Sequence, residues 1–108
     1  MARARMVHRT VFNLTPTKDK GEQWFWTTFS PNFKDTIADG GEGYDNLDGA
    51  LNGYFANQGF PDWKPEKNQY GSYVMPTEEF ISVPLNPKKF VVARFDKKLD
   101  GKPRKIGK

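Results

Sequence analysis

The 108-residue chain contains no cysteine, which excludes a disulfide framework, a thiol nucleophile and a thiolate metal site. Its only histidine, His8, lies in a basic N-terminal segment, where a lone histidine is typically an ordinary surface residue. No apolar run approaches the roughly 18 residues of a membrane-spanning helix. The basic N-terminal segment has no apolar stretch behind it, so it does not resemble a signal peptide. We therefore expect a cytoplasmic protein without membrane contact.

The length predicts a single domain, 1–108, which can bury a modest core without disulfides. Residues 1–6 lack a periodic apolar pattern and are expected to form a mobile basic arm, and residues 97–108 a solvated basic tail. Charge is unevenly distributed: residues 1–20 carry a net +4, residues 21–80 −7 and residues 81–108 +7. Such blocks indicate either an anionic partner or a device for solubility.

Alternation of apolar residues predicts three consecutive strands. Thr10, Phe12 and Leu14 share one face of the first. The segment 22–30 is rich in aromatic residues and threonine, and both of its faces carry rings, which favours a central strand covered at least partly on both sides. A short strand at 36–39 follows. Short connections join the three, so we expect an antiparallel meander.

A helix is expected over 47–58, after a glycine-rich turn. Asp45 or Asn46 can cap its N-terminus, and Gly59 lies just past its end. The predicted buried stripe consists of Leu47, Ala50, Leu51, Tyr54 and Phe55. Gly49 and Gly53 lie one turn apart inside this helix. They indicate either a strip where another backbone packs closely, or a helix held by tertiary contacts that tolerates two glycines.

Two β-rich runs, 79–85 and 90–95, flank an Asn-Pro turn and predict a C-terminal hairpin. Pro84 cannot donate to a strand ladder, so its strand should lie at an edge or be bulged there. Residues 73–75 can form a further short strand. The predicted fold class is α+β: a small antiparallel sheet built from a β-meander and a C-terminal hairpin, with one helix packed across it.

One stretch resembles a known family over residues 12–59. The matching landmarks are a Trp24-x-Trp26 strand, Asn32, Ile37-Ala38-Asp39, the turn Gly40-Gly41-Glu42-Gly43-Tyr44, Asn46 and Ala50. In order and spacing they resemble the small uncharacterised family called YegP-like (DUF1508). The resemblance implies an antiparallel sheet with one helix across it, often paired between chains. That family has no settled biochemical activity, so the resemblance supplies no active site and leaves the turn a structural role.

Catalytic and cofactor chemistry find little support in the sequence. Four carboxylates spaced by three residues flank the glycine turn and would repel phosphate; they could hold a hard cation, but the EF-hand pattern fails because glycines fill two of its ligand positions. They are Asp39, Glu42, Asp45 and Asp48. Glu42 is expected to accept hydrogen bonds from backbone N–H groups of the turn. No His–Ser or His–Asp pairing is apparent. We expect no enzyme activity, cofactor or metal.

Two binding hypotheses remain. The basic ends can bind nucleic acid if the first and last strands bring them together. The residues concerned are Arg3, Arg5, Arg9, Arg94, Lys97, Lys98, Lys102, Arg104 and Lys105. The other hypothesis is a protein–protein or assembly role, because nine Phe, four Tyr and three Trp exceed what one small helix and sheet easily cover. An open edge strand also invites a second copy. We favour a self-associating interaction module, with nucleic-acid binding as the alternative.

Overall fold

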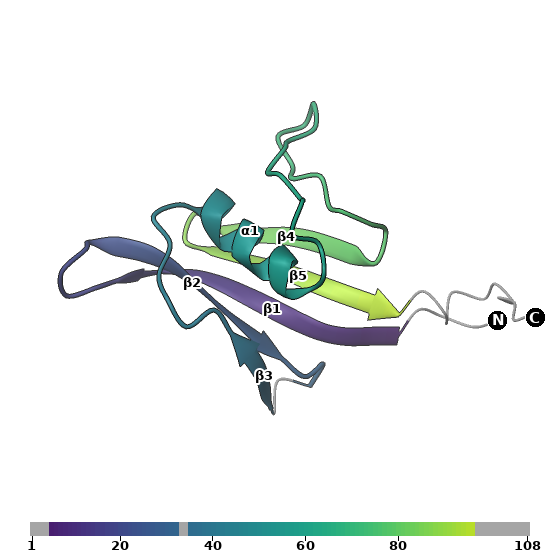
Figure 1. Ribbon diagram of the computed structural model, residues 1–108, viewed down its shortest axis with the longest axis horizontal. Coiled ribbons are helices and arrows are strands. Elements are labelled where there is room, and N and C mark those ends of the chain that lie inside the picture. Colours follow the sequence, from purple (N-terminus) through teal and green to yellow (C-terminus); the bar gives the residue numbers. More distant parts are fainter. Residues whose placement is uncertain (1–4, 33–34, 97–108) are drawn as a thin grey trace, which may run out of the picture.

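The computed structural model describes residues 5–32 and 35–96. They form one five-stranded antiparallel sheet with a single helix across it, as Figure 1 shows. The strand order is β3-β2-β1-β5-β4. The strands are β1 (Arg5–Pro16), β2 (Glu22–Phe29), β3 (Thr36–Asp39), β4 (Phe80–Asn86) and β5 (Lys89–Asp96). The predicted α+β class, with its meander, crossing helix and C-terminal hairpin, is confirmed.

β1 is the middle strand of the sheet. It pairs with β2 on one side, where Phe12 lies opposite Trp26, and with β5 on the other, where Phe12 lies opposite Phe90. Segment 22–30 forms β2, an interior strand between β3 and β1, but the middle of the sheet is β1, because the chain's last strand pairs with its first. Residues 73–75 form no strand; Tyr73 makes only an isolated bridge to Lys67.

β1 also begins earlier than the sequence indicates. Arg5 pairs with Asp96 and Met6 with Phe95, so both belong to the sheet and not to an arm. A register shift between Met6 and His8 separates these pairs from the rest of the ladder. This shift interrupts the simple alternation that would have revealed the strand. The remainder of the predicted arm, 1–4, and the tail, 97–108, lie outside the described residues.

The helix α1 (Leu47–Asn57) starts where the sequence predicts. Asn46 is the N-cap, and its side-chain Oδ1 accepts a 2.8 Å hydrogen bond from the Gly49 backbone N–H. Gly59 lies past the helix end at φ +98°, a conformation that favours glycine. Ala50, Leu51, Tyr54 and Phe55 are buried, which confirms four of the five predicted stripe residues; Leu47 is half-buried.

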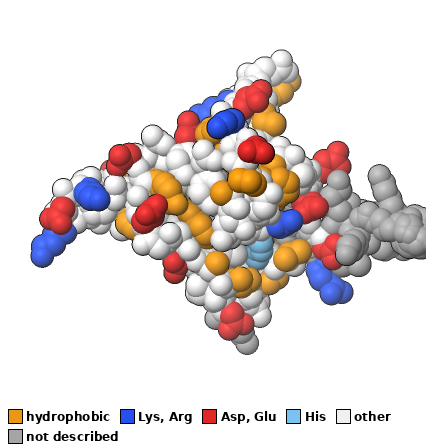
Figure 2. Space-filling view, viewed as in Figure 1, with side chains coloured by type: hydrophobic (Ala, Val, Ile, Leu, Met, Phe, Trp, Pro, Cys, Tyr) orange, Lys and Arg blue, Asp and Glu red, His pale blue; other side chains and the backbone are white. Residues whose placement is uncertain are grey.

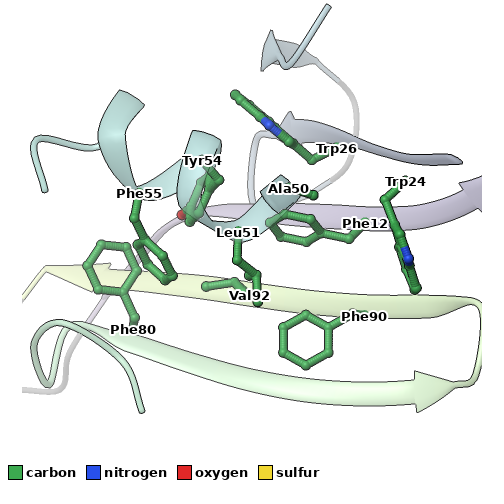
Figure 3. Close-up of a cluster of buried hydrophobic side chains, with 10 residues drawn as sticks. All are labelled: Phe12, Trp24, Trp26, Ala50, Leu51, Tyr54, Phe55, Phe80, Phe90 and Val92. Atoms are coloured by element: carbon green, nitrogen blue, oxygen red, sulfur yellow. The ribbon is translucent and has the colours of Figure 1, made fainter. Parts of the chain in front are cut away.

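The core lies between α1 and one face of the sheet (Figure 3). Tyr54 sits at its centre, with ring centroids 5.6 Å from Trp26 and 5.7 Å from Phe12, both nearly perpendicular. Edge-to-face pairs of this kind add to the stabilisation from burial. The buried hydrophobic residues are Phe12, Trp24, Trp26, Ala50, Leu51, Tyr54, Phe55, Phe80, Phe90 and Val92.

Most of the aromatic surplus is used inside the chain. Trp63 lies outside the sheet but packs on Phe55, with centroids 4.7 Å apart, and donates its indole N–H to the Val74 carbonyl. Among the described aromatic residues, Tyr70 alone is exposed. The aromatic count therefore does not by itself require a partner, and the alternative that the tryptophans fill the core is the better description.

The glycine turn packs tightly against β2. Gly40 and Gly43 lie against the side chains of Trp26 and Gln23, where a Cβ would be 2.6 Å and 2.2 Å from the nearest atoms. Gly41 has φ +74°. Tyr44 exchanges two backbone hydrogen bonds with Trp24, which fastens the turn to β2.

Two details of this region differ from expectation. Glu42 is exposed, and no hydrogen bond to its carboxylate is found within the described residues, so its predicted role as an acceptor is wrong. The helix glycines face a side chain. The sequence had suggested either a closely packed backbone or a helix held by tertiary contacts that tolerates two glycines. The Tyr44 ring lies beside Gly49 and presses on Gly53, where a Cβ would be 2.4 Å from the tyrosine oxygen.

Candidate interaction surface

The sheet has one covered and one uncovered face within the described part of the chain. Phe12, Trp26 and Val92 point toward α1, as Figure 3 shows. Successive side chains on a strand point to opposite faces, so their neighbours Val11, Thr27 and Val91 point away from the helix. No described helix packs over that side, because α1 is the only helix in the described residues and it lies on the other face. The turn at Gly43 contacts this side at Gln23 and Phe25, in the first half of β2. We call it the open face.

The strand register aligns the open-face residues into continuous rows. Two adjacent rows cross the sheet, and the second reaches β3 at Thr36 through a register shift. In the first, Val83, Val91, Val11, Thr27 and Asp39 lie side by side. In the second, Ile81, Ala93, Arg9 and Phe29 do. Ile81 and Val83 are 53% and 46% exposed, although a valine or isoleucine gains about 1.5–3 kcal/mol from full burial.

Charge is sparse on the open face and has both signs. Arg9 lies in β1, and one of its guanidinium N–H groups donates to the Pro31 carbonyl in the connection after β2. Asp39 lies in the edge strand β3 and is exposed, and Lys89 begins β5. The centre of the face is formed by Val11, Val91 and Thr27, none of which is charged.

Both edges of the sheet are interrupted. Pro84 lies in the edge strand β4 and has no N–H, as the sequence predicted for an edge position. Register shifts occur next to it, between Pro84 and Asn86, and at β3, between Thr28 and Phe29. Bulges and proline at edges discourage pairing with another strand. Edge-to-edge association is therefore less favourable than the open-edge hypothesis assumed.

The basic residues are placed by the structure in different environments. Arg94 points to the helix side, where its guanidinium bonds Glu79 Oε1 at 3.0 Å and Gln58 Oε1 at 2.6 Å, and its charge stacks on the Phe80 ring. Arg5 begins β1 opposite Asp96 at the end of β5, so the start of the first strand and the end of the last lie side by side at one end of the sheet. Arg3, Lys97, Lys98, Lys102, Arg104 and Lys105 lie outside the described residues.

On the helix side of the molecule, the described lysine and arginine side chains are scattered and do not gather into one patch (Figure 2). Arg94 is also neutralised by its ion pair with Glu79. Among the described residues, no group of three or more His, Asp or Glu is arranged to hold a metal ion. Because the described basic side chains on this side are scattered, they form no continuous track for a phosphate backbone.

His8 is buried, and its predicted place on the surface is wrong. Its Nε2 lies 3.1 Å from the Tyr54 hydroxyl oxygen, and the ring is 7% exposed. Burial, and then the nearby positive charge of Arg94, lower the pKa of His8 below its usual 6.5. Burial raises the pKa of Tyr54 to about 12. Both groups are uncharged at neutral pH, so they form part of the core and offer no acid–base chemistry at the surface.

Sequence reasoning named the basic ends and missed the open face. The sequence pattern indicates part of the open face, because Ile81 and Val83 alternate with Phe80 and Ser82 in the predicted hairpin. The face on which each strand residue lies was not available, since it depends on β1 pairing with β5 and on the side that α1 covers. His8 follows the same alternation as Thr10 and Phe12, so extending that pattern by two residues would have found it.

Comparisons with family models, curated proteins and solved structures find no match for this chain. The resemblance of residues 12–59 to the YegP-like family therefore stays a prediction. Within the described residues, no helix has the length and apolar character needed to cross a membrane.

Proposed function

We propose that the protein is a non-enzymatic interaction module that self-associates by packing the open faces of two copies against each other. The observation that carries the proposal is the uncovered apolar row of Val83, Val91 and Val11, continued by Thr27. Two sheets stack face to face at about 10 Å when side chains from their inner faces interdigitate. A second copy of this chain supplies such a face.

Area and charge both support a second copy as the occupant. Five strands spaced by about 4.8 Å, and about eight residues long at 3.3 Å each, present a flat area on the order of 600 Å². Stable interfaces bury roughly 800 Å² of accessible surface on each partner, which a corrugated face of this size approaches. Arg9 and Asp39 place opposite charges on the same face, as a self-complementary surface requires.

Sedimentation velocity over a dilution series tests the proposal, with Val83→Lys as the disrupting variant. Val83 is already 46% exposed, so the substitution adds a charge to the interface without opening the core. Tyr70→Lys, at a loop residue that is 82% exposed, is the matched control. We expect the wild type and Tyr70→Lys to dimerise alike and Val83→Lys to dissociate at least about tenfold more readily. A wild type that stays monomeric at high micromolar concentration, or two variants that behave alike, would overturn it.

The alternative function is nucleic-acid binding through the basic ends. The pairing of Arg5 with Asp96 favours it, because it starts both basic segments at the same end of the sheet. Engagement of Arg94 by Glu79 and Gln58 weighs against it. Filter binding of a single-stranded oligonucleotide at low and at moderate salt separates the two functions. Retention that falls steeply with salt would support the alternative, and no retention at low salt would remove it.

A further inference from the structure

A concave feature lies on the helix side, away from the open face. It is a pocket of about 220 Å³ between the start of α1, the loop that precedes β4, and the β4–β5 hairpin. Phe90 and Leu47 supply apolar surface, and Lys67, Ser72 and Ser82 supply polar groups. An engineered apolar cavity of about 150 Å³ holds benzene, so this volume admits one aromatic ring with a small substituent.

The loop that carries Lys67 and Ser72 is fixed by its own hydrogen bonds, while Ser82 lies in β4. The Asn68 side-chain oxygen accepts from the backbone N–H groups of Tyr70 and Ser72, and the Asn68 N–H donates to the Ser72 carbonyl. Gly71 takes φ +81° at the tip. The loop projects from the body of the molecule in Figure 1, yet its base is closed by the bridge between Lys67 and Tyr73. The backbone of the loop at Lys67 and Ser72 is thus held in one conformation by contacts within the loop.

Tyr73 is held in place from three directions. Its hydroxyl donates to the Asp48 carboxylate at the start of α1, its ring meets Phe90 edge-on at 5.7 Å, and the Lys67 ammonium lies 4.9 Å from its centroid. Burial and the hydrogen bond to Asp48 raise the pKa of Tyr73, so the hydroxyl keeps its proton at neutral pH. Asp48 is thereby engaged with Tyr73, and Lys67 supplies the positive charge at the pocket.

Lys67 is the cationic side chain among the residues that line the pocket. Neither of the two ion pairs found among the described residues includes it, and no hydrogen bond is found there for the hydroxyls of Ser72 or Ser82. An ammonium and two hydroxyls facing an aromatic floor match a carboxylate attached to a ring. We propose that this pocket binds a small aromatic monocarboxylate, with its ring on Phe90 and its carboxylate directed to Lys67.

A backbone-amide NMR titration of the full chain tests this site with three probes. Benzoate carries both the ring and the charge, benzyl alcohol the ring alone and acetate the charge alone. We expect benzoate to shift the amides of Ser72, Tyr73 and Ser82 saturably, in the millimolar range typical of so small a ligand. The other two probes should bind more weakly. Equal effects from benzoate and acetate, or no saturable shift with benzoate, would overturn the proposal.

Variants separate a specific site from general charge attraction. Lys67→Ala should weaken benzoate binding by about tenfold or more, because the charge-assisted contact is lost. Lys64→Ala removes the same charge from an exposed residue that does not line the pocket, and should leave binding unchanged. Ser82→Leu fills the pocket while leaving Lys67 in place and should also abolish binding. Unaltered binding in Lys67→Ala or in Ser82→Leu would contradict the assignment. Val83→Lys should bind benzoate normally, which keeps this test independent of self-association.

Discussion

The Tyr44 hydroxyl lies against Gly53, at a point where any Cβ on the helix would be 2.4 Å from the tyrosine oxygen. Tyr44 cannot withdraw easily, because its backbone exchanges two hydrogen bonds with Trp24 in β2. Gly53 lowers helix propensity, but it makes room for the ring of Tyr44, whose backbone ties the turn to the sheet. The glycine weakens the helix, and the space that it leaves allows Tyr44 to fix the connection between β3 and α1.

Gly53→Ala is therefore expected to destabilise the protein by about 1–3 kcal/mol, the usual range for overpacking. Gly49→Ala is the comparison in the same helix, because its Cβ would lie 3.3 Å from the Asn46 cap oxygen, a tight contact that a shift of a few tenths of an ångström relieves. It should therefore destabilise the protein less than Gly53→Ala, since the gain in helix propensity offsets the cost of that shift. Urea denaturation measures both. The Tyr44→Phe background should recover part of the loss caused by Gly53→Ala, and a loss of the same size in both backgrounds would contradict the assigned contact.

The stability of the protein should depend on pH through His8. The pKa of His8 is lower in the folded protein than its usual 6.5, so the unfolded chain takes up the proton first as the pH falls. The contribution of His8 is fully present above pH 6.5 and is lost as the pH falls through 6.5 toward the folded value. The free energy of unfolding from urea titrations should decrease between about pH 7.5 and pH 5.5. His8→Gln should flatten this dependence, whatever its own stability; equal slopes would contradict the account.

Burial is the largest cause of the lowered pKa of His8, and the positive charge of Arg94 is the second. Arg94→Gln should therefore raise the His8 pKa, measured from the ring proton resonances in an NMR titration. Glu79→Gln should move it in the opposite direction, because Glu79 Oε1 lies 3.0 Å from the guanidinium and offsets its charge. Two shifts of the same sign would show that the substitutions act by loosening the core and not through charge.

The Asn46 cap should be worth about 1 kcal/mol to the helix. Asn46→Ala removes the acceptor that lies 2.8 Å from the Gly49 N–H and leaves that donor to water. Thermal unfolding followed by circular dichroism should show the loss. Asn52→Ala, inside the helix, is the comparison, and helix propensity predicts that it is neutral or slightly stabilising. A cap variant as stable as the wild type would mean that the helix start is fixed by Tyr44 alone.

Local chemistry made the elements predictable from the sequence. The cap at Asn46, the glycine after the helix and the stripe around Leu51 and Phe55 fixed the helix and its buried face. Leu51 and Phe55 are fully buried, and the Trp26 ring lies beside Tyr54 in the same core, as the predicted packing requires. The hairpin around Pro87 followed from two β-rich runs and a turn.

What could not be predicted depends on contacts between distant parts of the chain. The pairing of β1 with β5 sets the strand order, buries His8 and decides which valines remain uncovered. The partner of Gly53 is a side chain that reaches the helix only because the turn folds back along β2. The pocket at Lys67 arises where a loop, a helix start and a hairpin converge, and no local pattern records that convergence.

The interrupted edges of the sheet have a consequence for what large assemblies the chain can build. At the β4 edge, Pro84 has no N–H to donate to an added strand. At the β3 edge, the register shift beside Phe29 interrupts the regular ladder. Lateral recruitment of further molecules, the route by which sheets grow into fibrils, is opposed on both flanks. In the proposed stacking, the second copy covers the open face, and neither edge of the described sheet favours a third molecule. The proposal therefore predicts a closed pair and not a filament.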